Sequence, residues 1–190
     1  MLIKKLKTAD EIIEFTNIFN KAIGYSNVPW QYHASGKCYA LCDNSKMVAG
    51  FCLIPGYFNL RSVLQMPEEK QKEFYSNYPK TSNNLSDLTG YFINNPNLKQ
   101  MLLFTLFLVV TCFFHRKKYF IYTYPVSDRA LEKYYGTGDP IRIHTGIPIK
   151  LPGHADHMES ENIEILTSWG VFKIFFYRTK RILKARFRKR

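Results

Sequence analysis

The chain has 190 residues, of which 46% are hydrophobic and 16% aromatic. It is therefore long and apolar enough for one domain with a full core, and its composition excludes an intrinsically disordered protein. The net charge is +12, but nine basic residues and no acidic residue lie in the last 18 positions. Because residues 1–172 are nearly balanced in charge, we do not expect nucleic acid as a partner, which would favour a basic stripe across the folded body.

Neither the cysteines nor the most apolar run indicates a secreted or membrane-spanning protein. The four cysteines show no Cys-x-x-Cys spacing, so we expect buried free thiols in a reducing cytoplasm. The first residues lack the apolar segment of a signal peptide. Met101–Phe114 is apolar over 14 residues, fewer than the roughly 18 needed to span a bilayer. We expect a buried helix there, with a hairpin-like insertion in the membrane as the alternative.

The first half of the chain predicts a strand, a helix and two further strands. Leu2–Lys7 reads as a strand, and Thr8–Glu11 has the sequence of a capping box that begins a helix with apolar residues at helical spacing. Cys38–Asp43 predicts a second strand. Met47–Leu60 predicts a third, which Pro55 and the glycine after it interrupt.

The second half alternates helices and strands before a polar loop and a basic C-terminal segment. The sequence predicts helices over Pro67–Tyr78 and Asn97–His115, strands over Leu85–Ile93, Tyr119–Tyr124, Ile141–Ile149 and Ile163–Leu166, and a loop over Leu151–Glu161. This order predicts a mixed α/β domain.

One short segment behind the Tyr119–Tyr124 strand carries a specific spacing. Ser127–Asp139 reads SDRALEKYYGTGD, which indicates a short helix that ends at glycine. It resembles the Asn-x-x-Ala-x-x-Leu-Tyr-x-Lys-x-Gly-Phe segment of the GNAT acyltransferase superfamily. Ala130, Tyr134 and Gly138 stand at the family's Ala, Tyr and Gly positions, whereas Ser127, Lys133, Gly136 and Asp139 replace its Asn, Leu, Lys and Phe.

A second segment and the order of the elements agree with this resemblance. Asp87–Pro96 looks like the family's fourth strand with the polar turn after it, and the resemblance covers roughly residues 2–149. It implies a single-domain GNAT-like mixed sheet flanked by helices, whose fourth and fifth strands splay apart around the arm of an acyl thioester. We expect the acyltransferase domain over residues 1–150, a loop with a last strand over 151–167, and a basic amphipathic helix over 168–190.

The resemblance also implies which groups take part in transfer of an acyl group to an amine. Tyr134 stands at the position of the family's proton donor, with a packed aromatic side chain as the alternative. Asp87 stands where members often carry an acidic residue whose carboxylate deprotonates the amine. The alternative is that Asp87 is a strand-start cap or forms a salt bridge. The oxyanion would bind a backbone N–H of the fourth strand, within Thr89, Gly90, Tyr91 and Phe92.

The chain departs from the family where a diphosphate should bind. The family's Arg/Gln-x-x-Gly-x-Gly/Ala signature is missing from Asn94–Met101, which contains no glycine, although Lys99 could still assist one phosphate at the helix N-terminus. This departure puts coenzyme A in doubt as the donor. Together with the apolar helix it favours a long acyl chain, as in the branch of autoinducer synthases and N-acyl amino acid synthases, which use acyl carrier protein.

The remaining polar clusters carry less information. His154, Asp156, His157 and Glu159 crowd into one loop, but no second ligand cluster accompanies them, so we predict no metal site. The isolated histidines His33, His115 and His144 are interpreted as structural.

The C-terminal segment Ser168–Arg190 combines seven large apolar residues with the nine basic ones. This composition favours a helix on an anionic membrane surface, and the alternatives are docking on the protein's own core or binding of nucleic acid or an acidic protein. The sequence thus predicts a cytoplasmic N-acyltransferase, peripheral on the inner membrane surface, which uses an acyl thioester of acyl carrier protein or coenzyme A. The alternative is a non-catalytic interaction module on a degenerate form of the same fold.

Overall fold

The computed structural model describes residues 1–23, 28–80, 84–94, 97–114, 118–153 and 159–187. In this part of the chain seven strands form one sheet in the order β1-β2-β3-β4-β5-β7-β6. Among these described strands, only the neighbours β4 and β5 run parallel. The strands are β1 (Leu2–Lys5), β2 (Lys37–Asp43), β3 (Lys46–Pro55), β4 (Leu85–Ile93), β5 (Tyr119–Pro125), β6 (Ile141–Gly146) and β7 (Glu161–Thr167).

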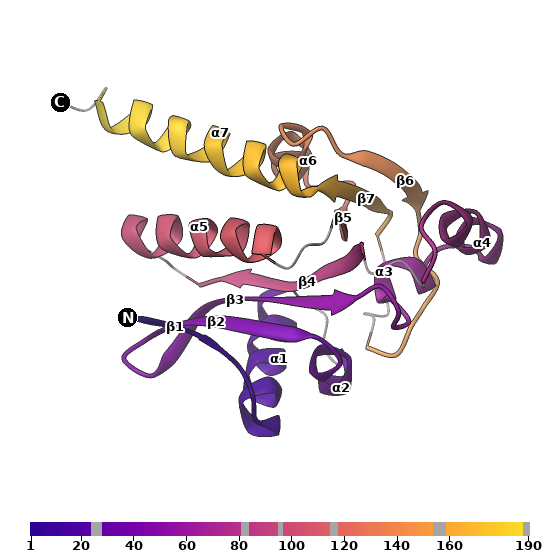
Figure 1. Cartoon of the computed structure of the whole chain (residues 1–190), viewed down its shortest axis with the longest axis horizontal. Coiled ribbons are helices and arrows are strands. Elements are labelled where there is room, and N and C mark those ends of the chain that lie inside the picture. The colour runs from indigo at the N-terminus through magenta and orange to yellow at the C-terminus, as the bar shows by residue number, and fades with distance from the viewer. Residues whose placement is uncertain (24–27, 81–83, 95–96, 115–117, 154–158, 188–190) are drawn as a thin grey trace.

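Helices cover both faces of the sheet, as Figure 1 shows: α1 and α2 lie on one face, and α5, α6 and α7 on the other. The helices are α1 (Ala9–Ile23), α2 (Trp30–Ala34), α3 (Arg61–Leu64), α4 (Glu68–Asn77), α5 (Leu98–Phe114), α6 (Arg129–Gly136) and α7 (Ser168–Phe187). Each face has its own core, and α3 and α4 contribute to the core under α1 and α2. The predicted fold class, a single-domain mixed sheet flanked by helices, is confirmed.

The predicted capping box begins α1. The Thr8 hydroxyl accepts the Glu11 N–H at 3.3 Å, and the Glu11 carboxylate accepts the Thr8 N–H at 3.2 Å. The same carboxylate pairs with Lys4 of β1 at 2.8 Å, which ties the helix to the first strand. One turn further on, Phe15 is fully buried, so the predicted apolar face of this helix packs on the sheet.

The structure corrects several predicted boundaries. The sequence predicted neither α2 nor α3, which are only five and four residues long. The third strand ends at Pro55 rather than Leu60. The sixth strand ends at Gly146 rather than Ile149, because Pro148 has no N–H to donate to the ladder.

The sequence predicted that the apolar helix α5 is buried, but the structure buries only one side of it. Phe104, Leu108, Val109 and Cys112 are buried against the sheet, whereas a second row of apolar side chains on the same helix is exposed. The four cysteines are free and buried, as predicted. None of the described helices combines the length and the apolar character that crossing a membrane requires.

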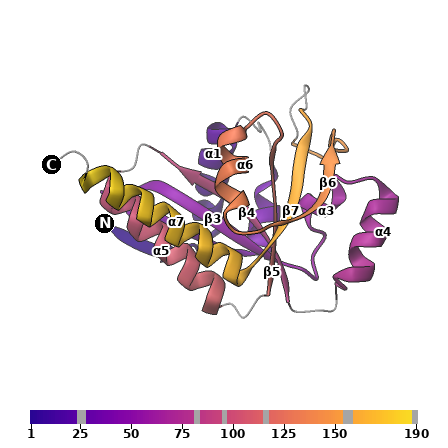
Figure 2. The same ribbon diagram turned by 90° about the horizontal axis from the view of Figure 1, so that it is seen from above.

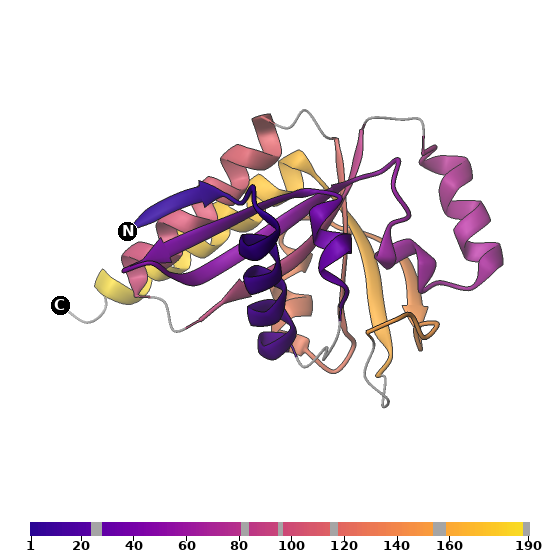
Figure 3. The same ribbon diagram turned by 90° about the horizontal axis from the view of Figure 1, so that it is seen from below.

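The parallel pair of strands separates soon after it begins. β4 pairs with β5 only over Leu85–Asp87 and Tyr119–Ile121, although β4 has nine residues and β5 has seven. Beyond these pairs the two strands diverge (Figure 3), and α6 lies above the region of divergence (Figure 2). The sheet therefore opens between two neighbouring strands at its centre.

A bulge in β4 lies just beyond the last of these pairs. The register with β3 passes from Cys52–Thr89 to Gly50–Phe92, so β4 has one residue more than β3 between these pairs. Gly90 within this bulge has a φ of +66°, a conformation that side chains with a Cβ rarely adopt. The bulge thus bends β4 at the point where it leaves β5.

Candidate active site

The predicted site residues of β4 point to both faces of the sheet at the divergence. Asp87 is the last residue paired with β5, and its side chain reaches α2 and α3. Gly90 packs against Phe15 of α1. Tyr91 lies on the opposite face, where its ring centroid is 6.3 Å from that of Phe104 in α5. The divergence therefore connects the α1/α2 face with the α5/α6 face.

Asp87 is held by donors from two short helices. The Tyr32 hydroxyl donates to its carboxylate at 2.7 Å, and Ser62 donates through its hydroxyl at 2.9 Å and its backbone N–H at 3.2 Å. The Arg61 N–H in turn donates to the Tyr32 hydroxyl at 2.9 Å. Asp87 is only 1% exposed, and this burial raises the pKa of its carboxyl group above the ordinary value even though the hydrogen bonds act to lower it.

This network bears on the role predicted for Asp87. Its carboxylate caps the first turn of α3 by accepting the Ser62 N–H, and no residue of α3's own N-terminus supplies a side-chain cap. Because Asp87 is buried behind Tyr32, it can receive a proton from an amine only through the Tyr32 hydroxyl or a water molecule. Its role as the carboxylate that deprotonates the amine stays a prediction.

His33 lies beside the bulge, a position that the sequence did not reveal. Its Nδ1 is 2.8 Å from the Thr16 hydroxyl oxygen. That hydroxyl donates its own proton to the Ile12 carbonyl, so it accepts one from His33, and the His33 Nε2 keeps a lone pair. Within the described residues this Nε2 has no hydrogen-bond partner, and it lies 3.3 Å from where a Cβ on Gly90 would stand.

Burial, together with the charge of Arg61, lowers the pKa of His33 to about 3. The imidazole is therefore neutral near pH 7. The interpretation of His33 as a structural histidine agrees with its full burial and its bond to Thr16. Its lone pair nevertheless leaves a hydrogen-bond acceptor at the β4 bulge.

On the opposite face, Tyr134 belongs to a cluster of tyrosines. The ring centroids of Tyr134 and Tyr135 in α6 are 5.5 Å apart. Tyr135 also lies against two tyrosines of β5, at 4.5 Å from Tyr122 and 5.4 Å from Tyr124. The sequence singled out Tyr134 alone, whereas the structure brings several phenols to the side of the divergence that α6 covers.

Residues at both ends position α6. Asp128 is its N-cap and accepts the Leu131 N–H at 2.9 Å. After the helix, Gly138 lies so close to Gly170 of α7 that a Cβ on Gly138 would be 2.9 Å from the Gly170 carbonyl oxygen. Gly138, which stands at the family's glycine position, is therefore required by close packing, and this contact fixes the end of α6.

A buried carboxylate orients the tyrosines of β5. Glu164 of β7 accepts the hydroxyls of Tyr122 at 2.7 Å and Tyr124 at 3.0 Å. Arg142 of β6 donates to the same carboxylate at 2.7 Å and to the Tyr124 hydroxyl at 3.1 Å. Burial and the Glu164 charge raise the pKa of Tyr124 to about 12. This network, which sequence reasoning missed, keeps both phenols protonated and joins three strands.

The N-terminus of α5 is where the missing diphosphate signature would lie. Asn97 and Gln100 cap each other there: the Asn97 amide oxygen accepts the Gln100 N–H, and the Gln100 amide oxygen accepts the Asn97 N–H, both at 2.9 Å. Gln100 also donates to the Asp43 carboxylate at 2.8 Å. Lys99 is exposed in this first turn, away from the buried groups of β4. Two backbone donors are thus occupied, and a negative charge lies close by.

Among the described residues, no group of three histidine, cysteine, aspartate or glutamate side chains could hold a metal ion. His154, Asp156 and His157 of the polar loop lie outside the described residues, as does His115.

Comparison with solved structures identifies the fold of this chain. No protein-family model and no curated protein sequence matches this chain. Among solved structures it is similar to FeeM, an N-acyl amino acid synthase from uncultured soil microbes, with 8% sequence identity and a TM-score of 0.65 over 89% of this chain and 97% of that one. A probable acetyltransferase from Staphylococcus epidermidis gives a TM-score of 0.57 at 9% identity over 87% and 98%.

A GNAT family acetyltransferase from Elizabethkingia anophelis, with acetyl-CoA bound, gives a TM-score of 0.52 at 10% identity over 87% of this chain and 97% of that one. The similarity in each case covers most of both chains. The chain therefore has the GNAT acyltransferase fold.

Proposed function

We propose that this protein is an N-acyltransferase that moves an acyl group from a thioester to an amine where β4 and β5 diverge. The observation that carries this proposal is the opening of the sheet after three parallel pairs, with a bulge in one strand and Tyr134 on the helix above it. The solved structures with the same fold are acyltransferases by name, and FeeM is named as an N-acyl amino acid synthase.

In the proposed reaction the amine nitrogen attacks the thioester carbonyl carbon. Negative charge then develops on the carbonyl oxygen, and in this proposal a backbone N–H of the bulge between Thr89 and Phe92 donates a hydrogen bond to it. When the carbon–sulfur bond breaks, Tyr134 donates a proton to the leaving thiolate. The proton lost by the amine passes to Asp87 through the Tyr32 hydroxyl. The products are an N-acyl amine and a free thiol.

The donor we propose is a long-chain acyl group on acyl carrier protein. The mutual capping of Asn97 and Gln100, with Asp43 beside it, leaves less room at the α5 N-terminus for the diphosphate of coenzyme A than an uncapped helix would. Acyl carrier protein brings its thioester without a free nucleotide diphosphate. Its binding therefore does not need the glycine signature at the α5 N-terminus. The apolar character of α5 is compatible with a long chain nearby.

Purified protein should be assayed for thiol release and for the N-acyl product with three donors at equal concentration. These are acetyl-coenzyme A, a long-chain acyl-coenzyme A, and the same long chain on acyl carrier protein, each with a mixture of amino acids and simple amines. We expect the carrier-protein thioester to be used fastest. Equal or faster transfer from the matched acyl-coenzyme A would refute the donor assignment and leave acyl transfer itself intact.

The non-catalytic alternative makes a different prediction in the same assay. It predicts that no donor yields an N-acyl product above the rate without protein, whatever the amine. The burial of Asp87 is the feature that favours it, because a carboxylate fully engaged with Tyr32 and Ser62 is a strong structural element without any catalysis. Product formation that depends on the protein would exclude this alternative.

A further inference from the structure

Large apolar side chains are exposed along the outer side of α5 and α7. On α5 they recur every three or four residues, which places them in one stripe: Leu103, Leu106, Val110, Phe113 and Phe114. Among the described side chains of α7, the large apolar ones that are exposed are Trp169, Phe176 and Tyr177. Single exposed apolar residues are common on protein surfaces, but continuous stripes on two adjacent helices indicate a binding surface.

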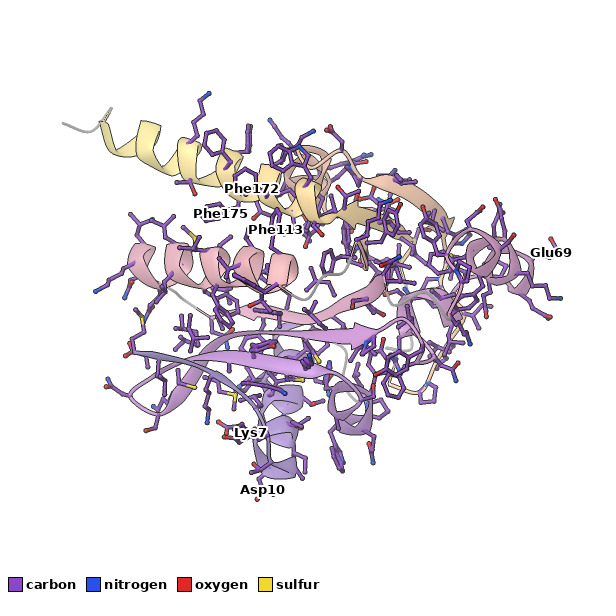
Figure 4. All side chains as sticks on the ribbon, in the orientation of Figure 1. Lys7, Asp10, Glu69, Phe113, Phe172 and Phe175 are labelled. Carbon is purple, nitrogen blue, oxygen red and sulfur yellow. The ribbon has the colours of Figure 1, made fainter. Side chains whose placement is uncertain are left out.

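Ring contacts join the two stripes into one surface. The centroids of Phe113 in α5 and Phe172 in α7 are 6.2 Å apart. Phe172 stacks on Trp169 at 5.0 Å and on Phe176 at 6.5 Å. Figure 4 shows Phe113 and Phe172 between the two helices, which run side by side in opposite directions (Figures 1 and 2). We call this surface, made of the α5 stripe with Trp169, Phe172 and Phe176, the aromatic face.

The other side of α7 fixes the aromatic face to the body of the protein. Val171 and Ile174 are buried in the core shared with α5. Lys173 pairs with Asp139, and Gly170 approaches the Gly138 carbonyl so closely that a Cβ would be 2.5 Å from it. The first turns of α7 are therefore docked on the protein's own core, one of the alternatives left open by the sequence. Trp169 and Phe176 remain exposed, whereas Phe172 is partly buried between them.

The apolar surface continues beyond α5 on the side away from α7. An open groove of about 380 Å³ lies between α5 and β2, and Phe107, Val110 and Phe114 line it together with Lys37 and Tyr39. Val110 and Phe114 belong to both the groove and the aromatic face. The exposed apolar area thus reaches across α5 from α7 to the edge of β2.

The two helices that bear this surface carry charge of one sign only. Neither α5 nor α7 contains an acidic residue, and nine basic residues lie in the last 18 positions of the chain. Aromatic and aliphatic side chains beside basic ones match the interface of an anionic bilayer, where rings enter the headgroup region and ammonium or guanidinium groups meet phosphates. A second copy of the same face would bring like charges together, which opposes dimerisation through it.

We propose that the aromatic face of α5 and α7 binds the surface of an anionic lipid bilayer. The two helices lie in the plane of the interface, with the exposed aromatic side chains among the lipid headgroups. This proposal does not depend on acyl transfer, because it concerns the outer side of α5 rather than the divergence of β4 and β5.

The test is binding of the full-length protein to sedimenting vesicles, either of phosphatidylcholine alone or with about one third phosphatidylglycerol. Leu106→Glu combined with Phe114→Glu changes two exposed side chains of the aromatic face, at 46% and 81% exposure. Ile147→Glu is the matched control, since Ile147 is 70% exposed and lies outside α5 and α7. We expect binding to the anionic vesicles, weakened roughly tenfold or more by the double substitution and unchanged by the control.

Fluorescence gives a second reading of the same contact. Trp169 is 58% exposed, so its emission should shift to shorter wavelength on anionic vesicles, and Trp169→Phe should abolish the shift. Raising the salt concentration should weaken binding, because salt screens the basic residues. Equal binding by the double variant, or equal binding to both vesicle types at all salt concentrations, would overturn the proposal. A dimer in sedimentation equilibrium that the double variant abolishes would instead assign the face to a second copy.

Discussion

Replacement of Gly90 by alanine tests the geometry of the β4 bulge. At a φ of +66° an added Cβ costs about 1–2 kcal/mol in backbone strain. That Cβ would also lie 2.8 and 2.9 Å from two ring carbons of Phe15. Phe15 is fully buried and in edge contact with His33, so its ring cannot move away, and overpacking adds about 1–3 kcal/mol. We expect Gly90→Ala to lower the free energy of unfolding by about 2–5 kcal/mol.

The measurement is urea unfolding of the purified variants at 25 °C. Gly136→Ala serves as the control, because nothing lies within 4 Å of its added Cβ and its φ is negative. We expect that control to be neutral or to stabilise the protein by up to about 1 kcal/mol. In a Phe15→Leu background the Gly90→Ala cost should fall to the backbone part, about 1–2 kcal/mol. Equal effects of Gly90→Ala and Gly136→Ala would refute the bulge geometry.

Three further predictions concern the titrating groups of the site. Because the pKa of His33 is about 3 in the folded protein against an ordinary 6.5, folding favours the neutral ring. The free energy of unfolding should therefore fall by about 2 kcal/mol between pH 7 and pH 5, and this fall should be smaller in His33→Gln. The same pH dependence of stability in both proteins would contradict the lowered pKa of His33. Asp87 acts in the opposite sense, since its raised pKa means that protonation in acid removes an unfavourable buried charge from the folded protein. Asp87→Asn should therefore make the loss of stability in acid steeper. A shallower loss in this variant would argue against a raised pKa. Tyr134→Phe keeps the ring contact with its neighbour and should lower acyl transfer by roughly ten- to a thousandfold with unchanged urea unfolding; unchanged turnover would remove this hydroxyl from the mechanism.

The sequence predicted those parts of the fold that depend on local signals. The capping box at Thr8–Glu11 and the strand Leu85–Ile93 are observed as predicted, because a cap and a hydrophobic strand pattern act over a few residues. The short helices α2 and α3 were missed, since five or four residues are too few to show a helical period. These two helices supply the hydrogen-bond partners of Asp87.

The contacts of the site could not be predicted because they join residues that are far apart in the chain. Tyr32 and Asp87 are separated by 55 positions. The last strand was predicted to begin at Ile163, because Glu161 and the asparagine after it look like loop residues. In the structure Glu161 is buried and accepts a hydrogen bond from Gln65 at 2.8 Å. Buried polar pairs of this kind give a strand a loop-like sequence.

The central claim is that the region where β4 and β5 diverge transfers an acyl group to an amine, and one measurement in cells tests it most directly. Lipid extracts from cells that overproduce the wild-type protein and Tyr134→Phe at equal levels should be compared by mass spectrometry. We expect an N-acylated amine with the wild-type protein that is strongly reduced with the variant, and its mass would identify both the acceptor and the chain length. No new N-acylated species with the wild-type protein, or the same amount from both, would contradict acyl transfer at this site.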